Sequence, residues 1–251
     1  MDAVKFFHVM FPFMDASRSD RAIYYEPPED QKVLLTDFER ELIDYHMYFN
    51  HFVVVPRGVL QLKYLHALLA RGAAVRCEQL DCPIDAVLPM VEGGRAEKGK
   101  ANLILLKAVT SSDGRPAEEV FRAMDPYALD IWAPDYAPNK PLIRIVFAFD
   151  VPREDSCFRI AKKENVDDQQ RMFVSYDIWI AGLSPALLGS VNPDTAQEMR
   201  EILLLCRAQR TRLFPDPHSR DRVPVMLQSF SLRAGGGARY QHWQGWTEDM
   251  L

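Results

Sequence analysis

The sequence predicts an α+β fold in which a helical N-terminal part packs on a mostly antiparallel sheet. Three observations support this fold class. Apolar residues follow a helical spacing through much of residues 1–92, and apolar runs typical of strands dominate residues 101–251. The strands of the second part do not alternate regularly with helices, which argues against a doubly wound parallel sheet. We expect a single domain over residues 1–251, with a helix-rich and a strand-rich part as its alternative subdivision.

The most regular helical pattern covers residues 36–53. Thr36 and Glu39 fit a capping box, in which each side chain accepts a hydrogen bond from a free backbone N–H of the first turn. Five large apolar residues then recur at spacings of four and three and so share one face: Phe38, Leu42, Tyr45, Phe49 and Phe52. Before this helix, residues 3–14 are expected to form a strand or a buried apolar lead-in.

A second helix is expected over residues 59–71. Gly72 would end it, because glycine readily adopts the left-handed conformation that follows many helices. A short strand over 73–77 and a short helix over 84–91 follow, although an internal proline weakens the second helix. The loop at 93–100, rich in glycine and charge, is the candidate domain boundary.

The second part of the chain contains most of the predicted strands. A buried strand is expected at 102–109 and a short helix at 117–124. Three further strands are close in sequence and joined by polar connections, which predicts an antiparallel meander: 142–149, 158–162 and 171–181. A helix over 194–207 and a last strand over 223–232 complete the expected elements.

The composition is that of an ordinary soluble globular protein. The 251 residues are 48% hydrophobic and carry a formal net charge of −5. This excludes a disordered chain, and the lack of a basic excess argues against a free-standing nucleic-acid-binding protein. Because the chain has neither a long uncharged apolar stretch nor a signal-peptide pattern, we expect a soluble intracellular protein, cytoplasmic or nuclear, without membrane association. Its four cysteines are interpreted as free thiols.

An arginine-rich segment near the C-terminus is the candidate binding site. Residues 207–222 carry five arginines and two acids, whereas residues 26–44 carry seven acids and two bases. Guanidinium groups pair with phosphate or carboxylate, and nearby indole rings offer stacking surfaces for bases. The alternative is that the first arginines cap the helix before them. The candidate residues are Arg207, Arg210, Arg212, Arg220, Arg222, Arg239, Trp243 and Trp246.

Other motifs match catalytic or metal sites only in part. Ser184 follows a predicted strand and resembles the nucleophile elbow of α/β-hydrolases, but Pro185 has no N–H for an oxyanion, so we expect Ser184 to cap a turn. His46 and His51 are five residues apart, too far to share a helix face as metal ligands. No glycine-rich segment continues into a phosphate-binding loop. An acidic cluster reads as a solvated turn: Asp150, Glu154 and Asp155.

Three functional hypotheses remain. The favoured one is a non-enzymatic interaction or assembly protein that docks a protein partner, or a second copy, through apolar chain ends and charged surfaces. The second is a module over residues 207–246 that binds nucleic acid or a phosphate-bearing ligand. The third is a hydrolase with an unrecognised site. We expect no cofactor and no metal, and the balance is against an enzyme.

Overall fold

The structure is a computed structural model, and it divides the chain into two compact units, Met1–Arg200 and Glu201–Leu251. The described residues all belong to the first unit. They are 1–15, 17, 25–55, 60–78, 82–94, 100–109, 115–149, 151, 155–189 and 191–199, without the side chains of 62, 63, 65 and 66. The expected strand at 223–232 and the end of the expected helix 194–207 lie outside them, and residues 193–199 are helical.

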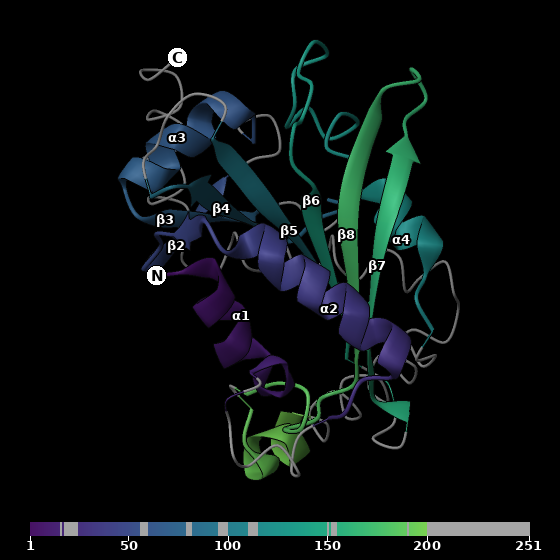
Figure 1. The fold of residues 1–251 in the computed structure, drawn as a ribbon. Helices are drawn as coiled ribbons and strands as arrows, with labels where there is room; N and C mark the ends of the chain where they lie inside the picture. The colour runs from purple at the N-terminus through teal and green to yellow at the C-terminus, as the bar shows by residue number, and fades with distance from the viewer. Residues whose placement is uncertain are drawn as a thin grey trace, which may run out of the picture. The chain divides into compact units, whose positions relative to one another are not determined.

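The described strands form one mixed sheet (Figure 1). Its order is β2-β3-β4-β5-β6-β8-β7, and β1 pairs with one end of β4. The pairs β2–β3, β5–β6 and β6–β8 are parallel, whereas the other pairs are antiparallel. The strands are β1 Tyr45–Met47, β2 His51–Val55, β3 Ala73–Cys77, β4 Ala86–Glu92, β5 Ala101–Val109, β6 Leu142–Ala148, β7 Cys157–Val166 and β8 Met172–Ala181.

The expectation of a mostly antiparallel sheet is therefore wrong. The predicted meander is wrong because β7 lies at the outer edge of the sheet, and β8 returns between β7 and β6. Strand β8 therefore pairs antiparallel with β7 and parallel with β6. A helix lies between β5 and β6, and such a crossover connection brings two strands into parallel pairing. Broadly, helices packed on a mixed sheet still fit an α+β fold. The strands on either side of residues 93–100, β4 and β5, are neighbours in the sheet.

One face of the sheet is covered by the N-terminal helices α1 and α2. Figure 1 shows α2 running across the near face of the sheet. The ring of Phe7 lies 5.0 Å from that of Phe38, and Phe38 lies 5.1 Å from Tyr176 on β8. Phe11 lies 5.7 Å from Phe158 on β7. Residues 3–14 thus form helical structure and no strand, and their aromatic side chains Phe7, Phe11 and Phe13 are buried within the chain itself. The elements are α1 Ala3–Met10, the 3-10 helix η1 Pro12–Met14 and α2 Glu29–Leu42.

The opposite face carries a second apolar core, which is completed by helix α4 and the segment after it. Trp179 on β8 packs against Phe121 of α4, and Trp132 packs edge-on against Phe173 at 5.6 Å. Helix α3 contacts β3 and β4, where Leu69 joins a cluster with Val91. The two helices are α3 Leu62–Ala70 and α4 Glu118–Ala123.

Two predicted helices are corrected by the structure. The helix expected over 36–53 begins earlier and ends at Leu42, so that Tyr45 and Phe52 lie on strands β1 and β2. The segment 84–91 contributes to strand β4 instead of a helix. Pro89 is tolerated there because it lies between the last pair with β3, at Val87, and the first pair with β1, at Met90.

Candidate functional sites

The arginine-rich site lies outside the described residues. Its eight members are Arg207, Arg210, Arg212, Arg220, Arg222, Arg239, Trp243 and Trp246. The site therefore stays a prediction. Among the described residues, 26–44 span the acidic helix α2, whose carboxylates have basic neighbours. Lys32 pairs with Glu26 and Glu29, and His8 lies 3.0 Å from Glu39.

Ser184 lies in a turn after β8 and bonds to backbone amides. The N–H of Ala186 donates to its hydroxyl at 3.3 Å, and the N–H groups of Leu187 and Leu188 donate to its carbonyl at 3.0 and 2.9 Å. These contacts are those of a residue that caps a turn. The expected capping role is therefore present, and these contacts supply no nucleophile–base pair.

The two histidines lie on different strands, His46 on β1 and His51 on β2. His46 stacks on Tyr48, and His51 contacts Asn50 at 2.6 Å. Across the part of the chain that the structure describes, no three His, Cys, Asp or Glu side chains are placed to hold a metal ion. Of the acidic cluster, Asp155 is exposed, and Asp150 and Glu154 lie outside the described residues.

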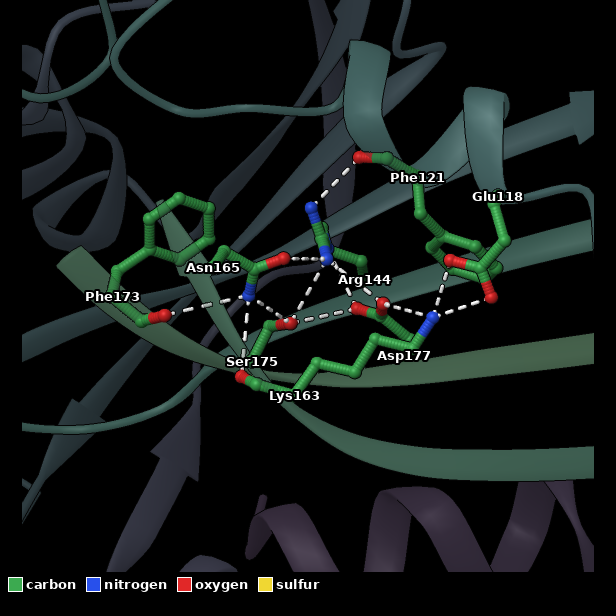
Figure 2. A network of polar contacts seen from close by, with 8 residues as sticks. All are labelled: Glu118, Phe121, Arg144, Lys163, Asn165, Phe173, Ser175 and Asp177. Atoms are coloured by element: carbon green, nitrogen blue, oxygen red, sulfur yellow. Dashed lines mark hydrogen bonds and ion pairs between the residues drawn. The ribbon is translucent and has the colours of Figure 1, made fainter. Parts of the chain in front are cut away.

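A buried polar network centred on Arg144 is the main charged feature of the core (Figure 2). Arg144 on β6 and Asp177 on β8 are 2% and 4% exposed and stand opposite each other in register. The guanidinium donates to both carboxylate oxygens, from Nε at 2.7 Å and from Nη2 at 2.8 Å. It also donates to the carbonyl of Phe121 at 2.7 Å, and so ties helix α4 to the sheet.

Two neutral side chains complete this network. The hydroxyl of Ser175 donates to Asp177 at 2.8 Å and accepts hydrogen bonds from Arg144 and Asn165. Figure 2 shows Lys163 at the edge of the cluster, between Glu118 and Asp177, where its ammonium lies 4.0 Å from the Asp177 carboxylate. Because the guanidinium, the carboxylate and the hydroxyl already have partners, the network is suited to holding the fold together and offers no free group to a substrate.

On the other face, a small cavity of about 10 Å³ lies beside Tyr176. The Tyr176 hydroxyl is buried and has no hydrogen-bond partner among the described residues. Burial raises the pKa of Tyr176. The Lys162 ammonium, which lies 5.2 Å from the ring centroid and near the hydroxyl without a hydrogen bond of normal geometry, lowers that pKa only in part. Burial also raises the pKa of Tyr45, which lines the same cavity, to about 12. The volume suits one water molecule and is far too small for an organic substrate.

The two edges of the sheet differ in how they are covered. Strand β2 is the first strand of the described sheet, and its Phe52 and Val54 side chains are 51% and 42% exposed. Its five residues carry no formal charge apart from the His51 ring when protonated. The other edge, β7, carries charges along its length: Arg159, Lys162, Lys163 and Glu164.

Two side chains also bond to the outward backbone of β7. The N–H of Ile160 donates to the Gln31 side chain of helix α2 at 2.7 Å, and the Tyr25 hydroxyl donates to the carbonyl of Phe158 at 3.4 Å. The β7 edge is thus both charged and covered, which are two usual means of preventing strand pairing. Strand β2 has neither within the described residues.

Free thiols are present at three of the four cysteines. Cys77 and Cys82 are buried, and Cys157 is half-buried. Burial, with Cys82 beside it, raises the pKa of Cys77 to about 12. Cys206 lies outside the described residues.

The sequence interpretation overlooked both the Arg144 network and the β2 edge. A signal for the network exists, because Arg144 and Asp177 each interrupt an apolar strand with a charge of opposite sign. The β2 edge was hidden because its apolar residues continue the helical spacing of the preceding segment.

No helix of the described residues is long and apolar enough to cross a membrane. Comparisons with family models, with curated proteins and with solved structures find no match to this chain.

Proposed function

We propose that this chain is a non-enzymatic interaction or assembly protein that docks a partner strand along β2. One observation carries the proposal: β2 is an uncharged strand at the edge of the described sheet, with two large apolar side chains exposed. Natural proteins usually protect such an edge because its free N–H and C=O groups pair readily with another strand. Pairing of this kind gives affinity through the main chain and selectivity through alternate side chains.

The covered β7 edge supports this interpretation by contrast. On β7, four of the ten residues are charged, and Gln31 and Tyr25 cover two outward backbone groups, whereas Phe52 and Val54 on β2 are in contact with solvent. An apolar edge that serves no purpose favours aggregation. A partner that covers β2 accounts for the difference between the two edges.

Burial of side chains also limits which surfaces of the described residues are open to a partner. The aromatic side chains Phe7, Phe11 and Phe13 of the N-terminal segment are buried in the chain's own core. They are therefore not available to a partner, so we assign the interaction to the sheet edge and not to the N-terminal end of the chain. The Arg144 network and the cavity beside Tyr176 offer no accessible reactive group, so they favour no enzymatic role. The nucleic-acid alternative depends on residues 207–246, outside the described part.

Site-specific photo-crosslinking tests the proposal. A photoreactive phenylalanine analogue at position 52 of the full chain should give a discrete covalent adduct in the protein's own cells. The substitution Val54→Lys in the same chain should abolish the adduct, because a buried lysine at the paired edge lacks a counter-charge.

The matched control places the same analogue at position 166. Val166 is 55% exposed and lies at the far edge of the same sheet, on β7. It should give no comparable adduct. If positions 52 and 166 crosslink alike, or if neither does, the docking role of β2 is wrong.

A further inference from the structure

We infer that the partner of β2 is a second copy of this chain, paired antiparallel about a two-fold axis at Val53. The inference rests on the proposed function, because it names the occupant of the same edge. It follows from the direction of the backbone groups of β2, from its sequence, and from the character of the other sheet edge.

The first step concerns the backbone. The carbonyl of Val55 accepts from the N–H of Glu78, so the polar groups of Val55 face β3. Strand residues alternate in direction, which turns those of Val53 toward β3 and those of Phe52 and Val54 toward the open edge. In an antiparallel ladder, residues that exchange both hydrogen bonds alternate with residues that exchange none. A two-fold axis at Val53 places Phe52 opposite Val54 of the second copy, and this register uses every outward N–H and C=O of both residues.

The second step concerns the side chains. Cross-strand partners point to the same face of a sheet, so Phe52 meets Val54 of the second copy twice, once on each side of the axis. Pairs of an aromatic and a β-branched residue stabilise antiparallel strands. His51 falls opposite Val55 of the second copy, so this register brings no two like charges together. The strand is therefore complementary to itself.

The third step compares the other available edge. A β7 strand from another copy would bring charged side chains such as Lys162 and Arg159 against the apolar Phe52 and Val54. Two of its outward backbone groups, the N–H of Ile160 and the carbonyl of Phe158, are also bonded to Gln31 and Tyr25. Between the two edges of the described sheet, β2 is the better partner for β2. The product is a closed, two-fold symmetric dimer with a continuous sheet, which leaves neither β2 edge open.

Light scattering on the whole 251-residue chain gives the first test. The mass should rise from one chain toward two over about a hundred-fold range of loading concentration, since a five-residue strand pair makes a small interface. Phe52→Lys should keep the mass at one chain over the same range. Met172→Lys, at a residue that is 65% exposed on β8, should dimerise like the parent. Circular dichroism checks that each variant is folded.

Disulfide trapping tests the register. Residues that face each other without exchanging hydrogen bonds have Cα atoms about 4.5 Å apart, within the range of a disulfide. Val53→Cys should therefore form a reducible dimer under mild air oxidation, in which two thiols join and their two electrons and two protons pass to oxygen. Val55→Cys alone should not, because its partner is His51; the parent chain measures any background from its own cysteines.

The outcomes separate the two proposals. A concentration-dependent dimer that Phe52→Lys abolishes and that Val53→Cys traps supports the inference. A monomer at every concentration overturns it, as does a dimer that is insensitive to Phe52→Lys or is trapped equally by Val55→Cys. If the chain is monomeric but the analogue at position 52 still crosslinks another protein, the second copy is wrong and the docking role remains. If it is monomeric and no adduct forms, both fail.

Discussion

Replacing the two charged members of the Arg144 network, singly and together, should show that they stabilise the fold as one unit. The substitutions are Arg144→Met, which is close in volume to the original, and Asp177→Leu, which keeps the number and branching of the side-chain heavy atoms. Removing one member of a buried ion pair is expected to lower the free energy of unfolding by about 3–5 kcal/mol, because the other charge stays buried without compensation. That loss is a large part of the total stability of an ordinary domain, about 5–15 kcal/mol.

The structure ranks the two single variants. Without Arg144, the Asp177 carboxylate still accepts from the Ser175 hydroxyl and lies 4.0 Å from the Lys163 ammonium, so the loss should be near 3 kcal/mol, at the lower end of about 3–5 kcal/mol. Without Asp177, the guanidinium keeps only neutral acceptors, among them the Phe121 carbonyl, so the loss should be near the upper end, about 5 kcal/mol. Independent effects would add to about 8 kcal/mol.

The double variant should instead lose no more free energy of unfolding than the less stable single variant, because no charge remains buried without its partner. The coupling free energy is then about 3 kcal/mol. Urea unfolding followed by circular dichroism measures all four proteins of the cycle, with equal slopes as the check that the unfolded states are comparable. Additivity within about 0.5 kcal/mol would refute the reasoning, as would a greater loss for Arg144→Met than for Asp177→Leu.

Three further predictions use single side chains. Tyr176→Phe removes a buried hydroxyl that has no hydrogen-bond partner of normal geometry. The free energy of unfolding in urea should therefore be unchanged or rise by up to about 1 kcal/mol, and a loss of more than about 1 kcal/mol would show that the hydroxyl is bonded. Burial raises the pKa of Tyr45 to about 12. The contribution of Tyr45 to the free energy of unfolding is therefore present below the unfolded pKa of about 10 and is lost as pH rises toward 12. Tyr45→Phe should flatten this alkaline loss of stability, and an unchanged pH profile would contradict the prediction. The pKa of Cys77, about 12, predicts that a thiol reagent at neutral pH modifies the half-buried Cys157 well before Cys77, as counted by peptide mass spectrometry; the reverse order would contradict it.

The sequence indicated where most strands lie but not how they are ordered. The strand at 73–77 is found as predicted, and those at 102–109 and 142–149 match β5 and β6 to within a residue, because runs of apolar residues between turn signals are local features. The position of β8 between β6 and β7 depends on which side of β7 the strand β8 returns, and no local pattern specifies that side.

The end of helix α2 shows a second limit. Tyr45, Phe49 and Phe52 continue the spacing of Phe38 and Leu42, yet the helix ends at Leu42. After that point, His51 to Val55 contains four residues of types that favour strands, three of them β-branched, and these pair with β3. Likewise, Arg144 and Asp177 are visible as single charges in apolar strands, but their pairing requires the parallel register of β6 and β8.

The cover that Gln31 and Tyr25 provide for β7 has a consequence for solubility in the cell. Both residues belong to the segment that leads into helix α2 and begins it, so this cover of the β7 edge is lost when the segment detaches, and only the charges of β7 itself then protect the edge. Detachment of the segment is a local opening, which takes less free energy than unfolding the whole unit. The tendency of the protein to aggregate should therefore follow the free energy of that local opening. Substitutions in residues 25–31 could then reduce the soluble yield while leaving the melting temperature almost unchanged.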